Sequence, residues 1–209
     1  MKKILILFTI LMSFNLSAQD KSYWMCFNFS VDKQSDANDL VSAVDMLMNA
    51  EEMSQLPYTV FLFEINFANS KSGFTHQLCF LAQNADYLKQ WGGGPGQFAE
   101  SMLTNRIFED VATPYSSVLS SPLIFDSEKA GSYAYANVWE VKVTDVEKFA
   151  SLASDFIEAN SNTFDGVIEL HEAISGAESG VTHFMVARSN NLGDWLRGRE
   201  SVFANPKSQ

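Results

Sequence analysis

Alternation of apolar and polar residues predicts the first strand of the chain, at residues 23–31. Phe27 and Phe29 fall on one face of this segment, and Asn28 and Ser30 fall on the other. A period of two is typical of a strand with one buried face. After a polar stretch, the apolar positions of residues 39–48 recur three and four apart, which predicts an amphipathic helix.

The same two periods predict the order of elements in the rest of the chain. The stretch between Pro114 and Pro122 is rich in Ser and is predicted to be a connection. The predicted strands are 59–67, 75–82, 123–125, 135–143, 167–173 and 183–188, and the predicted helices are 84–91, 98–111, 145–159 and 191–203.

One short sequence occurs twice, at a constant offset of 107 positions. Ser72-Gly73-Phe74-Thr75-His76 returns as Ser179-Gly180-Val181-Thr182-His183, and each copy precedes an apolar run. Two copies about a hundred residues apart indicate a duplicated domain. Strand, helix, hairpin, helix and strand form the split βαβ, or ferredoxin-like, unit. The closing strand of the second unit is not evident in the sequence.

This order of elements resembles the dimeric α+β barrel superfamily, which includes the antibiotic-biosynthesis-monooxygenase and stress-responsive barrel families. The resemblance covers roughly residues 22–205 and rests on element order and duplication. It implies an α+β fold in which two tandem ferredoxin-like repeats, 19–127 and 128–209, form an intramolecular barrel. A barrel closed within one chain predicts a monomer.

Some relatives in this superfamily handle haem and hold it through a histidine on a helix. None of the three histidines of this chain falls on a predicted helix. The resemblance therefore supplies no haem ligand, and we predict no cofactor.

The N-terminus has the three parts of a secretory signal peptide. Lys2 and Lys3 form a basic segment, residues 4–11 are apolar, and Leu16-Ser17-Ala18 is a small-residue cleavage site. The apolar run is shorter than the roughly 20 residues of a membrane-spanning helix. We therefore predict cleavage after Ala18 and an exported, soluble product in the periplasm or outside the cell, with no stable membrane insertion. An uncleaved anchor is the alternative.

The charge balance argues against nucleic-acid partners. Without Lys2 and Lys3 the chain has 12 basic and 25 acidic residues, a formal charge of −13. Such a surface repels phosphate backbones and anionic membranes. An apolar content of 46% indicates a packed globule.

The two cysteines, Cys26 and Cys79, both lie in strand-like segments of the first repeat. An exported protein with an even number of cysteines permits one disulfide. Two buried free thiols fit the same pattern.

The three histidines fall at related positions of the two repeats. His76 corresponds to His183, and at the same offset His171 corresponds to Glu64. If each hairpin is symmetric about its turn, Glu64 faces His76 and His171 faces His183. Imidazoles with a carboxylate suit Zn, Fe or Cu. Solvated residues beside a turn give the same pattern, so no metal is predicted, and a site shared by these four residues is the alternative.

A second candidate site is the inside of the barrel. If Phe61 and Phe63 pack on the helices, the alternate positions of the strands line the interior, including Glu169, His171 and Arg188. Such a mixture of charged and apolar residues suits a small-molecule pocket. A filled core with its charges at the barrel mouth is the alternative. The candidate ligand-binding residues are Glu64, His76, Glu169, His171, His183 and Arg188.

These features predict an exported barrel that binds a small molecule. A first alternative is a cofactor-independent monooxygenase or isomerase for an aromatic or enolisable substrate, with His183 or His76 as the general base. A second is a structural or interaction module with a packed interior. The sequence contains no P-loop, nucleophile elbow, zincin or EF-hand motif.

Overall fold

The computed structural model describes residues 21–32, 34–49, 58–67, 73–91, 111–129 and 131–206. The first half contains β1 (Tyr23–Ser30), α2 (Gln34–Met48), β2 (Tyr58–Glu64), β3 (His76–Ala82), the 3₁₀ helix η1 (Ala85–Trp91) and β4 (Thr113–Ile124). The second half contains β5 (Tyr135–Val141), α5 (Val146–Asn160), β6 (Val167–Ser175), β7 (His183–Ser189) and α6 (Leu192–Ala204).

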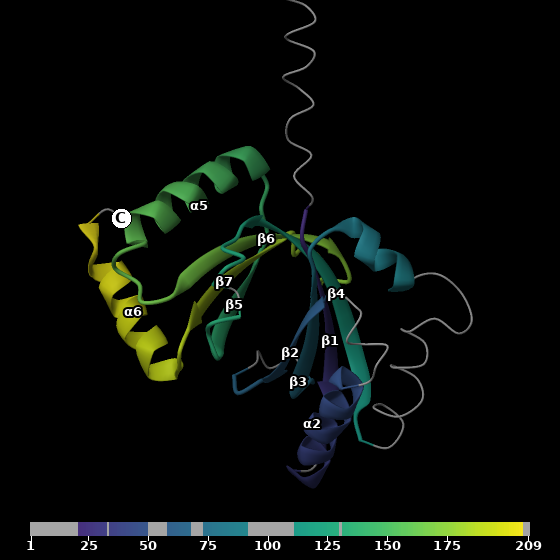
Figure 1. Ribbon diagram of the computed structural model, residues 1–209. Coiled ribbons are helices and arrows are strands. Elements are labelled where there is room, and N and C mark those ends of the chain that lie inside the picture. The colour runs from purple at the N-terminus through teal and green to yellow at the C-terminus, as the bar shows by residue number, and fades with distance from the viewer. Residues whose placement is uncertain are drawn as a thin grey trace, which may run out of the picture.

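All seven described strands form one antiparallel sheet in the order β2-β3-β1-β4-β6-β7-β5. The first four strands have the order of a complete ferredoxin-like unit, and β6-β7-β5 repeat it without a closing strand among the described residues. Figure 1 shows α5 and α6 on one side of the second half and α2 beside the first half. The predicted α+β barrel fold is confirmed, whereas an origin by duplication stays a prediction.

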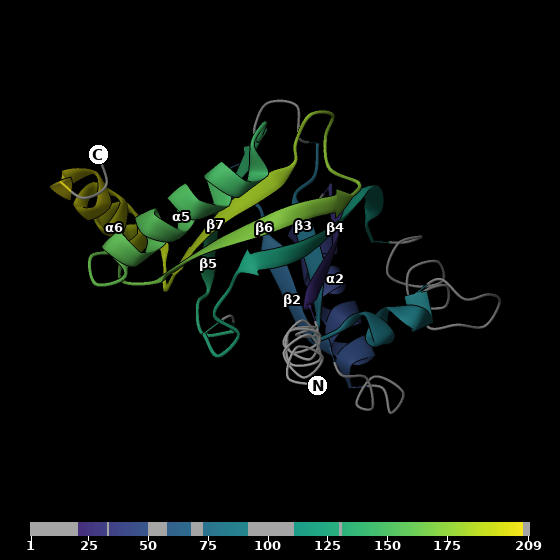
Figure 2. The same ribbon diagram turned by 90° about the horizontal axis from the view of Figure 1, so that it is seen from above.

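The pairing of β4 with β6 joins the two halves into a single sheet. Its register shifts twice, between Leu119 and Ser120 and between Pro122 and Ile124. Such irregularities bend and twist a strand. Figure 2 shows the curled sheet from above, with the helices of the second half outside it. We call the face that carries the helices the outer face and the opposite, concave face the inner face.

The main core lies on the outer face of the first half, between the sheet and α2. Leu40 and Val44 of the helix pack there with Phe29, Leu78 and Phe80 of β1 and β3, all of them buried. The spacing of Leu40 and Val44 is the one from which the helix was predicted. The helix begins at Gln34, five residues before the predicted start.

The first strand differs from its prediction because both of its faces are buried. Met25 and Phe29 lie in the core under α2, and Trp24 and Asn28 on the inner face are also buried. β1 lies between β3 and β4 within a curled sheet, so its inner face is covered by side chains from other strands. Polar Asn28 is accommodated by hydrogen bonds to Ser116 and Gln77.

The predicted connection between Pro114 and Pro122 is wrong, because these residues belong to the twelve-residue strand β4. Pro lacks a backbone N–H and is normally confined to strand ends or bulges. Pro114 is the second residue of β4, and Pro122 lies at a register shift. Both prolines therefore lie at an end or an irregularity of the strand, where proline is tolerated.

The ends of other strands and helices differ from their predicted positions by a few residues. The second strand ends at Glu64, so Phe67 lies beyond it and is 76% exposed. Asn84, the first residue of the predicted helix 84–91, caps it, since its side chain accepts from the N–H groups of Asp86 and Tyr87, but this helix is 3₁₀. The predicted signal peptide 1–18 lies outside the described residues. So does the predicted helix 98–111, except for its last residue, Val111.

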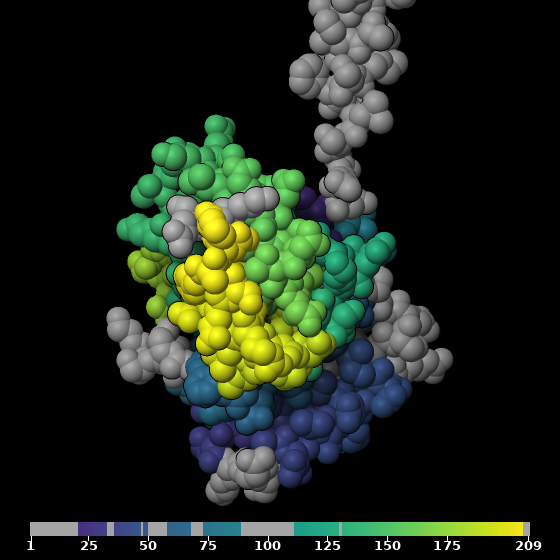
Figure 3. Space-filling view, turned by 90° about the vertical axis from the view of Figure 1, so that its left-hand side faces the viewer, coloured from purple at the N-terminus to yellow at the C-terminus, as the bar shows by residue number. Residues whose placement is uncertain are grey.

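The second half agrees closely with its predicted elements. Asp145 and Asn191, the first residues of the two predicted helices, cap α5 and α6 through their side chains. Gly176 has a φ of +78°, and a Cβ there would lie 1.9 Å from the carbonyl oxygen of Ser117. The turn after β6 therefore requires glycine where it passes β4. Seen from the side of α6, this helix (yellow) covers the molecule's face over the green segments of the second half (Figure 3).

The predicted boundary between the repeats, at residues 127 and 128, falls in the turn that connects β4 to β5. Within the described part of the chain, no helix has the length and apolar character needed to cross a membrane.

A disulfide joins Cys26 of β1 to Cys79 of β3. The two residues face each other in the ladder, with Cα atoms 4.1 Å apart, as in a non-hydrogen-bonded antiparallel pair. The bond lies on the inner face, and Cys79 is 1% exposed. Of the two alternatives for the cysteines, the structure has the disulfide.

We expect Cys26→Ala/Cys79→Ala to lower the free energy of unfolding by about 2–4 kcal/mol, since the bond closes a long loop in the unfolded chain. Urea denaturation measures this difference. A reductant should destabilise the wild type by a similar amount and leave the variant unchanged. A variant as stable as the oxidised wild type would contradict a structural role for the bond.

Candidate functional site

The register of β6 and β7 places three ionisable residues on the inner face. Val167 pairs with Arg188, and Glu169 and His171 follow on the same face of β6. Ile168 and Ala187 lie on the opposite face, where they pack against α5 and α6. The predicted interior positions Glu169, His171 and Arg188 are therefore brought together.

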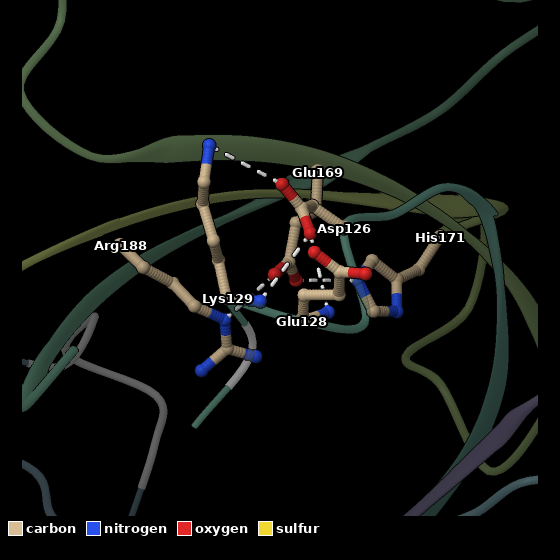
Figure 4. A network of polar contacts seen from close by, with 6 residues as sticks. All are labelled: Asp126, Glu128, Lys129, Glu169, His171 and Arg188. Carbon is tan, nitrogen blue, oxygen red and sulfur yellow. Dashed lines mark hydrogen bonds and ion pairs between the residues drawn. The ribbon is translucent and has the colours of Figure 1, made fainter. Parts of the chain in front are cut away.

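Glu169 is the centre of this group. Arg188 Nε donates to Glu169 Oε1 over 3.0 Å, and Nε2 of His171 lies 2.9 Å from Glu169 Oε2. Figure 4 shows the carboxylate between the guanidinium and the imidazole. The Glu169 side chain is 0% exposed, and the side chains of His171 and Arg188 are 4% and 5% exposed. A carboxylate without contact with water needs such partners, because an unpaired buried charge is very costly.

Aromatic side chains surround the ionisable group. The rings of Trp24 and Phe125 each lie 6.2 Å from the His171 ring, with edge-on geometry. The Arg188 Cζ atom lies 4.9 Å from the centre of the Trp24 ring, a cation–π contact. β1 and β7 are three steps apart in the sheet, about 14 Å when flat. The contact between Trp24 and Arg188 is therefore made across the concave face.

Two donors in this group have no acceptor among the described residues. Within the part of the chain that the structure describes, Arg188 makes hydrogen bonds only through Nε, and Figure 4 shows its two Nη nitrogens directed away from Glu169. The indole Nε1–H of Trp24 is buried without a partner. The Arg188 Nη atoms are not among the buried atoms that lack partners, so they keep contact with solvent. The group thus has donors that no described residue accepts from.

Glu64 and His76 lie on the outer face of the first half. They face each other across β2 and β3, as the hairpin symmetry predicted. A shallow pocket of about 270 Å³ lies beside them, slightly below the ~300–1,000 Å³ of most ligand pockets. It is lined by Val31, Asp32, Ala37, Glu64, Ile65, Thr75 and His76.

Thr75 orients the His76 ring. Its hydroxyl accepts from the Val31 N–H and lies 2.9 Å from His76 Nδ1, to which it can donate. A neutral His76 in this arrangement carries its proton on Nε2 and acts as a donor. Burial lowers the pKa of His76, and the charge of Glu64 opposes this shift. His76 is therefore neutral near pH 7.

The second half repeats this arrangement around His183. The Thr182 hydroxyl lies 2.9 Å from His183 Nδ1 and accepts from the Val143 N–H. Here the ring is 2% exposed beside Phe149 of α5, and its Nε2 has no hydrogen-bond partner. Burial lowers the pKa of His183, and the charge of Glu172 partly offsets this effect.

The expected pairing of His171 with His183 is wrong. His183 faces Glu172, and His171 faces Phe184 on the other side of the sheet. The hairpin of the second half is one residue shorter than that of the first, since twelve positions separate Glu64 from His76 and eleven separate Glu172 from His183. A one-residue slip reverses every side chain of a strand.

The prediction of which residues line the interior is wrong for the first half, because equivalent positions of the two halves lie on opposite faces of the sheet. Val60 and Leu62 pack on the outer core, and Phe61 and Phe63 lie on the inner face. The inner face therefore has two phenylalanines where the second half has Glu169 and His171. Glu64, His76, His171 and His183 do not converge, and no group of three or more metal-ligating side chains occurs among the described residues.

Sequence reasoning missed Trp24 and Phe125 as members of the inner group. Trp24 lies outside the Phe positions from which the buried face of β1 was inferred, and Phe125 is the last residue of a segment predicted to be a short strand. Their contacts with His171 depend on the curl of the sheet, which has no local signal in the sequence.

The comparisons with known proteins identify the fold. No protein-family model matches the chain, and no curated protein has a significantly similar sequence. A chlorite dismutase variant from Candidatus Nitrospira defluvii has a similar structure, with a TM-score of 0.54 and 13% identity over 91% of this chain and 86% of that chain. A heme-binding protein from Thermus thermophilus has a TM-score of 0.52 and 11% identity, covering 90% of this chain and 85% of that chain.

A putative chlorite dismutase is similar to the same degree, with a TM-score of 0.52 and 9% identity over 90% of this chain and 87% of that chain. At such identities the similarity establishes the ferredoxin-like α+β fold alone. Assignment to the antibiotic-biosynthesis-monooxygenase or stress-responsive families stays a prediction.

We expect Glu169→Gln to lower the free energy of unfolding by about 3–5 kcal/mol, because Arg188 would become an uncompensated buried charge. The double variant Glu169→Gln/Arg188→Met should lose less stability than the two single variants together. Urea denaturation of the four proteins measures this coupling. Strictly additive losses would contradict a buried pair.

The lowered pKa of His183 makes the native state resist protonation of this ring. Below about pH 6.5 the unfolded state binds the proton and the native state does not, so stability falls as the pH falls through this value. His183→Gln should therefore lose less stability than the wild type between about pH 7 and about pH 5. Urea denaturation at both pH values tests this, and equal losses would contradict it.

Proposed function

We propose that the protein binds a small molecule on the inner face of its curled sheet. The observation that carries this proposal is the pair of unused donors, the Arg188 Nη groups and the Trp24 indole N–H, in a buried aromatic setting. The Trp24 N–H is the buried member of this pair, and leaving a buried donor without an acceptor costs roughly 1–3 kcal/mol. A ligand with an acceptor group would remove this cost.

The composition of the inner face supports the proposal. Trp24 packs against Phe61 and Phe125, with ring centres 5.0 and 6.3 Å apart. Ligand pockets combine a mainly apolar and aromatic wall with a few placed polar groups. Here Glu169 holds Arg188 and His171 in place, so the polar groups are fixed before any ligand arrives.

Haem is the ligand that the name of one structural neighbour gives, and the described residues do not fit it. α5 and α6, which cover the second half, contain no His, Cys, Met or Tyr. His183 has an unpartnered Nε2, but this atom is buried beside Phe149 of α5. A macrocycle would have to displace α5 to reach it. The proposal therefore includes no haem.

We also propose that the protein is exported and works as a monomer. The signal-like N-terminus and the disulfide support export, because disulfides persist in oxidising compartments. The joining of both halves in one sheet through β4 and β6 supports a monomer.

Calorimetric titration with cinnamate, cinnamamide, cinnamyl alcohol, cinnamylamine and hemin tests the proposed function. We expect at least one cinnamyl compound to bind with one-to-one stoichiometry, and Phe125→Ala to weaken it about tenfold through lost apolar contact. Phe203→Ala, on the exposed surface of α6, should leave the affinity unchanged.

If none of the four cinnamyl compounds binds, or if Phe125→Ala has no effect on binding, the inner face is not the binding site. Stoichiometric binding of hemin that is lost in His183→Ala would replace the proposal with a haem site on the outer face.

A further inference from the structure

We infer that the group recognised on the inner face is a carboxylate attached to an aromatic body. This inference rests on the proposed function and specifies the class of ligand. It follows from which hydrogen-bond donors of Arg188 and Trp24 have no acceptor among the described residues.

Each oxygen of Glu169 is already bonded, one to Arg188 Nε and the other to His171 Nε2. Among the described residues, the donors of the inner group without an acceptor are the Nη groups of Arg188 and Nε1 of Trp24, and neither group can accept a hydrogen bond. A ligand that bonds to these donors must therefore present acceptors.

The shape of the free donors selects a planar oxygen pair. The guanidinium presents its N–H bonds as a rigid fork that fits a carboxylate through two parallel hydrogen bonds. Arg188 cannot reorient freely, because Nε is held by Glu169 and Cζ lies over the Trp24 ring. The free edge of the fork is therefore fixed and keeps contact with solvent.

Trp24 contributes a further donor beside the same guanidinium. Its Nε1–H is the buried group whose need for an acceptor is unmet, and its ring lies 4.9 Å from Arg188 Cζ. A carboxylate at the free edge of Arg188 has lone pairs left for this N–H. Because the positive charge of Arg188 would be shared between Glu169 and a ligand carboxylate, the neutral indole donor becomes important for affinity.

The apolar surroundings determine the rest of the ligand. Trp24, Cys79 and Leu81 form a buried cluster with Phe61, Phe63 and Phe125 packed against it. Phe61 and Phe63 are stacked with ring centres 6.0 Å apart. A flat aromatic body can pack on such rings in offset or edge-on geometry.

Calorimetric titration of the wild type with cinnamate and cinnamamide tests this inference. The two compounds have the same body, but the amide replaces one acceptor oxygen with a donor. We expect cinnamate to bind at least tenfold more tightly. Arg188→Lys, which keeps the charge and loses the fork, should weaken cinnamate about 10–100-fold. Trp24→Phe should weaken it about 3–10-fold through loss of one hydrogen bond.

Neither variant should change the affinity for cinnamamide more than about threefold. Trp139→Phe is the matched control, because Trp139 lies on the outer face of β5 and is 40% exposed. Near-ultraviolet circular dichroism checks that each variant is folded. If Arg188→Lys does not fold, Trp24→Phe alone decides the outcome.

The outcomes separate the inference from the proposed function. Equal affinity for cinnamate and cinnamamide, or cinnamate binding that Trp24→Phe leaves unchanged, would overturn the carboxylate and leave an inner-face binding site. Absence of binding by every cinnamyl compound would reject both.

Discussion

The fold depends on the hydrogen-bonded pairing of β4 with β6. Each half alone has a helix-covered face and an open face, and an open apolar face must be buried elsewhere. By pairing the last strand of the first half with the second strand of the other half, the chain curls one sheet around both open faces. Trp24 of β1 then reaches Arg188 of β7 across the concave side.

The two halves use this interior differently. The first half contributes Phe61, Phe63 and the disulfide, whereas the second half contributes a buried carboxylate with a guanidinium and an imidazole. A fully apolar interior of this volume would be at least as stable, because a buried ion pair seldom repays its desolvation. Stability alone therefore does not account for Glu169 and Arg188, which agrees with the binding role proposed for them. The haem-binding and chlorite dismutase neighbours share the fold, and His183 of this chain is buried beside Phe149 of α5.

Much of the fold could be predicted from local patterns, and the site only in part. Apolar periods of two and about 3.6 located most elements, and the repeated Thr-His pairs located both hairpins. The register could not be predicted, because one residue fewer in the second hairpin moves His171 to the inner face and leaves His183 on the outer one. Glu169, His171 and Arg188 were grouped correctly by strand alternation. Trp24 and Phe125 join them only through the curvature set by β4.

A crystal structure of the protein with bound cinnamate tests the account most directly. The account predicts the carboxylate within hydrogen-bond distance of the Arg188 Nη groups and Trp24 Nε1, with the ring against Phe61 or Phe125. Cinnamate in the pocket beside His76, or an inner face whose donors contact only protein atoms in the complex, would contradict it.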